Sequence, residues 1–501
     1  MQELTLKQTL NSLSGFIPET VLIATVIVCL FLDLILRKKS VIVAVAGIVG
    51  LLVSGYFAYL QFGMREVIFT GMAVVDPFAV FFKILFVVST IFVIIFTISS
   101  KEIQESTHHN EHVYLMVAMA LGAFLMASAS NMIMMYLSLE TVSISSYILS
   151  GYTKRIKRSS EAAMKYVIYG AASSGIMIYG MSLIYGFTGS MNIYEISAIL
   201  AKSAVTGNPV IVMSIIMILA GFGYKISSVP FHFWTPDVYE GAPVPVTAFL
   251  AVTSSAAGFA VMIRFFAVTF LQNNILLNGK LQIIPGINWT EIIVVLSVAS
   301  MIIGNFTAVW QQSVKRMLAY SSIAQGGYIM LGMTMATQQG LTAMLVYLMG
   351  YLFMTLGAFY VVILVANKVD SDELVDMRGF GYKSPVIAVF MAVFMFSLAG
   401  IPSTVGFVGK FYLFSALIES NMVWLALVAV LNSVVSLFFY IKVLKYMFLM
   451  KPEEELTPKY QYGIGNYAVL LLLALPVMFF GLYFAPLVKI AEYSAILIGL
   501  K

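Results

Sequence analysis

Three ionisable residues lie in the middle of long apolar stretches of this 501-residue chain: Glu140, Lys225 and Lys410. A charged side chain at the centre of a bilayer costs about 2.5–3.5 kcal/mol on insertion scales, so a residue that remains there usually has a function. A buried lysine can exchange a proton, because desolvation disfavours its charged form and a neighbouring carboxylate favours it again. These three residues therefore predict a proton-transfer site built from one glutamate and two lysines.

Both lysines lie next to an interruption of their apolar segment. Lys225 precedes the sequence Ser-Ser-Val-Pro at 227–230, and Lys410 follows Gly-Ile-Pro-Ser at 400–403. Proline opens a helix and frees carbonyl groups, and such backbone survives at membrane depth only inside protein or beside a hydrated cavity. A broken helix beside a buried ammonium predicts an ion site, and its recurrence indicates an internal repeat. The alternative is that the lysines only form structural ion pairs with Glu140 and hydroxyl groups.

Two weaker candidates accompany these residues. Glu161 and Lys165 are spaced i, i+4 with the acid first, which favours a local salt bridge on a helix. Lys165 is equally consistent with a group that admits protons from the cytoplasmic surface. His232 follows the first break, where a histidine, which titrates near neutral pH, suits a proton relay. The aromatic residues around His232 are equally consistent with a belt at the membrane interface.

The elements that must position these residues follow from the composition. Hydrophobic residues make up 61% of the chain and charged residues 10%, against roughly 25% charged in soluble proteins. About fourteen apolar segments of membrane-spanning length are separated by short polar connections. In hydrocarbon, backbone polar groups must pair within each segment, so we expect an all-α polytopic membrane protein. A soluble dehydrogenase, a nucleic-acid binder and a secreted disulfide scaffold are excluded.

The basic residues predict the orientation. With the N-terminus outside, sixteen of the 28 lysines and arginines fall in connections that face the cytoplasm, and five fall on the opposite side. Positive residues favour the cytoplasmic side, so both termini are expected outside. The other seven lie inside apolar segments. Among these, Arg264 is expected to pair with a neighbour, and Lys83 to extend towards the membrane interface.

No cofactor or metal site is expected in this chain. The single cysteine, Cys29, has no partner for a disulfide or a thiolate-held metal. The sequence Gly-Phe-Gly at 221–223 lacks the strand and the third glycine of a nucleotide-binding fingerprint. His108, His109 and His112 are close in sequence, but a solvated loop is the favoured interpretation.

Three stretches resemble the proton-pumping, antiporter-like subunits of respiratory complex I. They are KISSVPFHFWTPDVYEGAPVPVT at 225–247, KRMLAYSSIAQ at 315–325 and GIPSTVGFVGKFY at 400–412. The resemblance extends over nearly the whole chain. Among the subfamilies, subunit N matches best, because the tract WTPDVYEGAP at 234–243 is typical of it. Subunit M usually carries a glutamate where Lys410 stands.

The resemblance implies an architecture. Members of this family have fourteen transmembrane helices that include two inverted five-helix repeats. Here the repeats would cover roughly 112–271 and 290–449 of a single membrane domain, 1–501. The two long helices that are broken near Pro230 and Pro402 would occupy corresponding places in the two repeats.

The resemblance also implies roles for individual residues. The proton-transfer residues would be Glu140, Lys165, Lys225 and Lys410, with the last one towards the outside. Possible relay positions would be His232, Ser255 and Gln325. Many members carry a relay lysine where Ser255 stands and a histidine where Gln325 stands. Neither replacement can hold a charge, so the middle of the lateral path would have to use water, hydroxyl groups or other side chains.

The implied function is that of a proton-translocating subunit of NADH:quinone oxidoreductase in the bacterial inner (plasma) membrane. Quinone reduction would take place elsewhere in the complex, which would also supply FMN and iron–sulfur clusters. The partners would be the other membrane subunits, the peripheral redox arm and the lipid bilayer, without nucleic acid. Two alternatives remain: a subunit of a multisubunit Na⁺/H⁺ antiporter, and a structural membrane subunit that has lost transport.

Overall fold

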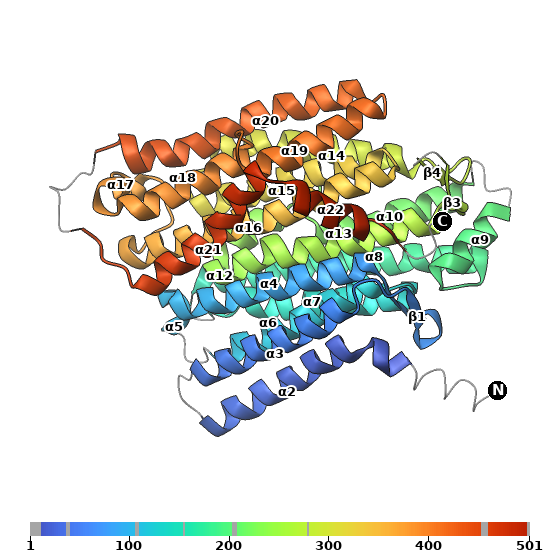
Figure 1. The fold of residues 1–501 in the computed structure, drawn as a ribbon, viewed down its shortest axis with the longest axis horizontal. Coiled ribbons are helices and arrows are strands. Elements are labelled where there is room, and N and C mark those ends of the chain that lie inside the picture. The colour runs from blue at the N-terminus through green and yellow to red at the C-terminus, as the bar shows by residue number, and fades with distance from the viewer. Residues whose placement is uncertain are drawn as a thin grey trace.

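The computed structural model describes residues 12–36, 41–105, 110–153, 156–202, 208–277, 280–451 and 459–497. Within these ranges the chain is almost entirely helical, and most helices lie side by side along one common direction (Figure 1). The N-terminal helix α2 (Ile17–Leu36) lies at one edge of the bundle and α20 (Val423–Leu444) at the other.

The helical elements of the first half, in chain order, are α2, α3 (Val41–Leu60), the short η1 (Phe69–Gly71), α4 (Pro77–Ser99), α5 (Lys101–Gln104), α6 (Glu111–Ser128), α7 (Met132–Ser150), α8 (Lys157–Thr188), α9 (Ile193–Lys202), α10 (Pro209–Lys225), α11 (Thr235–Gly241), α12 (Val244–Phe249), the π-helical η2 (Leu250–Ser254) and α13 (Ser255–Thr269).

Those of the second half are α14 (Trp289–Trp310), α15 (Val314–Thr334), α16 (Gln338–Val369), the short η3 (Val375–Met377), α17 (Phe380–Lys383), α18 (Pro385–Ala399), α19 (Val405–Glu419), α20, the π-helical η4 (Lys445–Leu449), α21 (Ile464–Leu482) and α22 (Ala485–Ser494). Two antiparallel hairpins, β1 (Glu66–Ile68) with β2 (Ala73–Val75) and β3 (Leu271–Leu277) with β4 (Lys280–Ile283), connect helices at the same end of the bundle.

Eleven helices in the described ranges are long and apolar enough to cross a membrane. The number becomes twelve if Val375–Lys383 and Pro385–Ala399, which meet at an angle of 118°, count as one span. The predicted segments around both breaks are divided into shorter helices, since α10 has 17 residues and α18 and α19 have 15 each. The all-α membrane fold is confirmed, whereas the exact count of fourteen stays a prediction.

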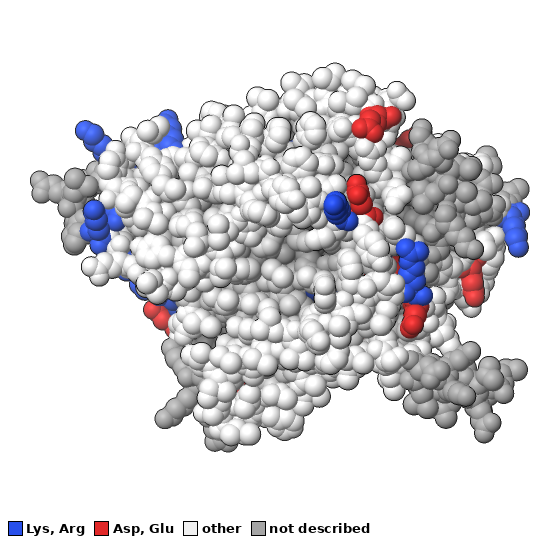
Figure 2. Space-filling view, viewed as in Figure 1, with Lys and Arg blue, Asp and Glu red and all other residues white. Residues whose placement is uncertain are grey.

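The surface agrees with a membrane-spanning bundle. Figure 2 shows that charged side chains gather towards the two ends of the molecule, with a broad uncharged surface between them. The start of α2 lies at the end that carries β1 and α9, and α5 and α17 lie at the opposite end. We call the latter the α5 end. The termini themselves, and the predicted basic loop at 37–39, lie outside the described residues.

The most buried helices form the centre of the bundle. The span from Val244 to Thr269 combines α12, η2 and α13, and its most apolar part is completely buried inside the bundle. The most apolar part of α16 is almost completely buried as well. The helix α16 packs against α15, α18 and α19 from the second half and against α4 and α12 from the first half. The two halves of the chain therefore meet along α12 and α16.

Both predicted breaks are present. The helix α10 ends at Lys225, and the backbone reaches α11 through Ser227 with a positive φ of 59°. The helix α18 ends at Ala399, and Gly400 follows with a φ of 87°. A Cβ atom at Gly400 would lie 2.9 Å from Cδ of Lys410, so glycine allows the lysine side chain to pass close to the break. Whether the two halves are inverted repeats stays a prediction.

Candidate functional site

The first buried ammonium belongs to Lys225, the last residue of α10. Its side chain is 1% exposed and donates a hydrogen bond to the hydroxyl of Ser143 on α7, at 3.2 Å. Asn131 and Asn208 cap the first turns of α7 and α10, which defines where these helices begin. The break directly after Lys225 places the ammonium inside the bundle instead of at its surface.

Glu140 lies one turn before Ser143 on the same helix and is half-buried. Residues three apart share one helix face, so the carboxylate and the Lys225 partner are neighbours. The two charges interact electrostatically, but the described residues contain no direct ion pair between Glu140 and Lys225. One carboxylate oxygen of Glu140 is buried and has no hydrogen-bond partner among the described residues. The lysine is thus held by a hydroxyl, with the glutamate as its nearest charged neighbour along α7.

The second buried ammonium belongs to Lys410 on α19, whose side chain is 3% exposed. It donates hydrogen bonds to the carbonyls of Ala399 at 2.9 Å and Leu398 at 3.3 Å, and to the hydroxyl of Ser433 at 2.9 Å. The two carbonyls end α18, where the break leaves them without helical partners. The ammonium also lies 4.8 Å from the ring centre of Tyr328. A lysine has three donors, and here three neutral oxygens accept them.

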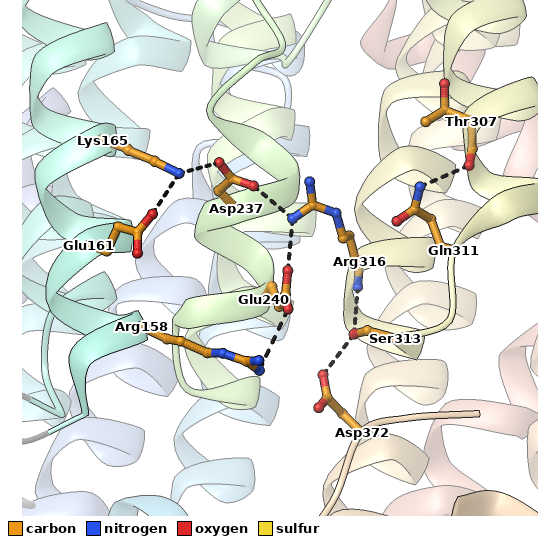
Figure 3. Close-up of polar contacts among 10 residues, drawn as sticks. All are labelled: Arg158, Glu161, Lys165, Asp237, Glu240, Thr307, Gln311, Ser313, Arg316 and Asp372. Atoms are coloured by element: carbon orange, nitrogen blue, oxygen red, sulfur yellow. Dashed lines mark hydrogen bonds and ion pairs between the residues drawn. The ribbon is translucent and has the colours of Figure 1, made fainter. Parts of the chain in front are cut away.

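Lys165, in the N-terminal part of α8, lies in a network of charged side chains (Figure 3). Its ammonium contacts Glu161 at 2.8 Å, as predicted, and also Asp237 on α11 at 2.6 Å. Arg316 on α15 contacts the other oxygen of Asp237 at 2.7 Å and Glu240 at 2.8 Å. The Lys165 side chain is 38% exposed, so it is not a buried lysine like the other two. The network joins α8, α11 and α15, which come from both halves of the chain.

Sequence reasoning missed Asp237, Glu240 and Arg316 as members of this network. All three lie in the two stretches that carry the family resemblance, 225–247 and 315–325. The presence of these three charged residues in those two stretches was the sequence signal that could have identified them. Their contact depends on the packing of α11 against α15, which no local pattern reveals.

The possible relay residues have separate surroundings. His232 is 6% exposed between α10 and α11, and its Nδ1 atom has no partner among the described residues. Ser255, the first residue of α13, is 6% exposed and donates to the carbonyl of Leu250, the first residue of the π-helical turn η2, at 3.2 Å. Such turns are often found at functional sites. Among the described residues, no hydrogen bond joins His232 or Ser255 directly to Lys225 or Lys410.

Gln325 has the most extensive contacts of the predicted relay positions. It is 1% exposed, and its amide nitrogen donates to the carbonyl of Leu398 at 3.1 Å and to the hydroxyl of Tyr440 at 3.0 Å. Its amide oxygen accepts a hydrogen bond from the hydroxyl of Tyr347. The Leu398 carbonyl is also an acceptor for Lys410. Gln325 and Lys410 are therefore brought together at the second break.

Two buried ion pairs lie outside these sites. Arg264 donates two hydrogen bonds of 2.8 Å to Asp76, and both side chains are fully buried, as the predicted pairing required. Lys83 contacts Glu19 at 2.7 Å, and both are nearly inaccessible. The expectation that Lys83 extends to the interface was wrong, because the carboxylate of α2 stabilises its charge inside the bundle.

A cavity of about 850 Å³ opens at the α5 end, where Lys101 and Glu102 of α5 line it. Its lining includes Glu102, Lys315, Asp372 and Val244, the first residue of α12. Burial raises the pKa of Glu102, and the nearby Lys315 and the Val244 backbone N–H partly oppose this shift. The cavity brings charged groups to the start of the central buried span.

Metal ligands do not cluster in the described part of the chain, which holds no group of three or more His, Cys, Asp or Glu residues that could bind an ion. His112 lies in α6, is fully buried and contacts Tyr152, with ring centres 3.4 Å apart and ring planes tilted by 50°. The interpretation of His112 as part of a solvated loop was therefore wrong. His108 and His109 lie outside the described residues.

Comparison with known proteins identifies the family of this chain. Residues 129–436 match the family described as NADH:quinone oxidoreductase/Mrp antiporter, TM. NADH-quinone oxidoreductase subunit N 2 of Chloroherpeton thalassium is 47% identical over 492 residues, covering 97% of this chain and 95% of the relative. Subunit N of Chlorobium chlorochromatii is 45% identical, with 98% and 96% covered. This chain belongs to the subunit N family of NADH-quinone oxidoreductases.

Solved structures agree with the membrane fold of this chain. A chain of respiratory complex I from Thermus thermophilus is 27% identical, with a TM-score of 0.78 and coverage of 94% of this chain and 98% of that one. A chain of the Mrp complex from Dietzia sp. shares the fold with a TM-score of 0.81 at 19% identity, covering 96% and 97%. At that identity the likeness shows the fold alone.

Proposed function

We propose that this chain translocates protons across the bacterial plasma membrane as subunit N of an NADH:quinone oxidoreductase, using Glu140, Lys225 and Lys410 as proton carriers. The observation that carries this proposal is the pair of buried ammonium groups, each beside a break in a membrane helix. Each ammonium is held by neutral oxygens instead of a direct carboxylate partner. A lysine held in this way can lose its proton without breaking a direct ion pair.

In the first half, the charge of Glu140 controls the proton on Lys225. A nearby negative charge favours the ammonium, and neutralising or moving that charge favours the amine. The Ser143 hydroxyl can accept from the ammonium or donate to the amine, so it serves both states. This arrangement makes proton release from Lys225 depend on events at Glu140.

In the second half, the dipoles of the broken helix replace the glutamate. The carbonyls of Leu398 and Ala399 stabilise the Lys410 ammonium by charge–dipole interaction. The hydroxyl of Ser433 and the ring of Tyr328 contribute further neutral partners. Lys410 thus has a proton site whose environment carries no fixed negative charge.

The sides of the membrane follow from the basic residues. We infer that the α5 end faces the cytoplasm and that both termini face outside, because the connections at the α5 end hold most of the basic residues. Protons then enter near the network of Lys165 and Asp237 and the cavity beside Glu102. We also propose that the two halves, roughly 112–271 and 290–449 of one membrane domain, are inverted repeats.

The partners of the chain are the other membrane subunits of the oxidoreductase, and the redox cofactors belong to other subunits. The carboxylate of Glu140 is half-buried in the isolated chain, so a neighbouring subunit or lipid borders it in the complex. We do not favour the antiporter alternative, since the curated relatives at 47% and 45% identity are named as oxidoreductase subunits.

The test is the number of protons pumped per electron by the whole enzyme in proteoliposomes. Lys225→Met is expected to lower this ratio, because methionine keeps the volume of the side chain and removes the proton site. Lys442→Met is the matched control. Lys442 donates to the carbonyls of Val309 and Gln311 at a helix end, so its loss should leave the ratio unchanged. An unchanged ratio in Lys225→Met, at normal assembly and NADH oxidation, would sink the proposal.

A further inference from the structure

Gln325 and Lys410 both donate a hydrogen bond to the backbone carbonyl of Leu398. The amide nitrogen of Gln325 lies 3.1 Å from this oxygen, and the Lys410 ammonium lies 3.3 Å from it. Both side chains are buried, with 1% and 3% exposed. The carbonyl belongs to the last turn of α18, where the break removes its helical partner. Side chains from α15 and α19 therefore meet at one freed carbonyl.

The partners of Gln325 determine how its amide is oriented. A carbonyl can only accept a hydrogen bond, so the nitrogen of the amide must face Leu398. The same nitrogen donates its second proton to the hydroxyl of Tyr440 at 3.0 Å, and the amide oxygen accepts from the hydroxyl of Tyr347. A flipped amide would bring two oxygens together at the break. The donor towards Leu398 is thus a fixed feature of the site.

Packing holds the two tyrosines in place. The hydroxyl of Tyr440 forms a second hydrogen bond, with Ser321 at 2.5 Å. The ring of Tyr347 lies directly against Gly409, the residue before Lys410, and a Cβ atom there would collide with it. Glycine at this position allows α16 to approach α19 closely. The Gln325 amide is therefore fixed relative to the helix that carries Lys410.

We propose that Gln325 is a positioning residue that keeps the Leu398 carbonyl hydrogen-bonded when Lys410 gives up its proton. This inference rests on the proposed function of Lys410 as a proton carrier. An amine is a much weaker donor than an ammonium, so the carbonyl would lose its charged partner in the neutral state of Lys410. Buried carbonyls without a donor are rare and unfavourable. The amide has no charge to lose, so it satisfies the carbonyl in both states.

The experiment uses the whole enzyme in proteoliposomes and measures the rate of NADH-driven proton uptake. Gln325→Met keeps a similar volume but has no donor, so proton release from Lys410 should become harder. We expect a roughly fivefold lower rate, the factor that corresponds to the loss of one neutral hydrogen bond. Gln325→His offers an N–H donor again and should restore a rate close to that of the parent enzyme. If histidine gives no rescue, the amide does not act as a donor and the inference fails.

Tyr351→Phe is the matched control, because it removes a buried tyrosine hydroxyl that donates to Ser322 between the same two helices, α16 and α15, and leaves the Leu398 contact intact. It should pump at nearly the parent rate. A rate as low as that of Gln325→Met would mean that the whole cluster, and not the carbonyl, matters. If Gln325→Met fails to assemble, Gln325→Asn supplies the comparison, since its shorter side chain cannot reach the carbonyl.

Lys410→Met separates this inference from the proposed function. An unchanged proton yield in Lys410→Met would overturn the role of Lys410 as a carrier. A lower yield in Lys410→Met together with a normal rate in Gln325→Met would overturn only the role of Gln325.

Discussion

Replacing Arg264 with methionine is expected to destabilise the subunit strongly, and the structure gives the size of the effect. The guanidinium group donates two hydrogen bonds of 2.8 Å to Asp76 and one of 2.9 Å to the carbonyl of Ala127. Neither charged side chain has any exposed surface. Asp76 also accepts from the backbone N–H of Ala79 and so caps α4. The pair therefore connects α13 to the start of α4 inside the protein.

Removing one partner of such a pair costs about 3–5 kcal/mol, because the other charge stays buried without its counter-charge. Arg264→Met should therefore lose about 3–5 kcal/mol of unfolding free energy. Asp76→Ala should lose about 1 kcal/mol more, since it also removes the cap of α4. The double variant Asp76→Asn with Arg264→Met removes both charges and keeps a capping oxygen. It should be more stable than either single variant.

The assay is the midpoint of thermal unfolding of the solubilised enzyme, together with the amount of intact subunit in the membrane. Arg158→Met is the control, because its side chain is 72% exposed and lies 3.7 Å from Glu240, so its loss should be neutral. Normal stability of Arg264→Met would refute the reasoning. If the double variant loses as much unfolding free energy as the two single variants together, an unpaired buried charge is not the cause of their instability.

Two further outcomes are expected. Ser143→Ala removes the acceptor of the Lys225 ammonium and should slow coupled turnover about tenfold, the size expected for a hydrogen bond to a charged group. Ser143→Thr keeps the hydroxyl and should recover most of the rate. Equal rates in the two variants would contradict this prediction. Asp237→Asn removes partly exposed pairs worth about 0.2–1 kcal/mol each, so its effect on stability should be small. High salt should weaken the parent network and leave the Asp237→Asn variant unchanged in a melting experiment, and a salt effect of the same size in both would argue against the network.

The sequence was sufficient to locate the two lysine sites and the breaks beside them. The cost of a charge in hydrocarbon and the effect of proline on a helix are local properties, so Lys225, Lys410, Pro230 and Pro402 are conspicuous in a linear reading. The helical pair of Glu161 and Lys165 was predictable for the same reason, since its geometry lies within one turn. The membership of the subunit N family also followed from sequence motifs.

The partners of these residues were decided only by the tertiary structure. Arg264 and Asp76 are 188 residues apart, and Gln325 and Leu398 are 73 residues apart. Nothing in either local sequence indicates which helix lies opposite. Lys225 binds the hydroxyl of Ser143, and Gln325 binds the carbonyl that also holds Lys410, because of the lateral packing of helices in the bundle. Hydrophobic patterning determines that a segment spans the membrane and which residues are costly to bury there. The choice of neighbouring helix depends on shape and hydrogen bonding between distant segments, and the chemistry of each site depends on that choice.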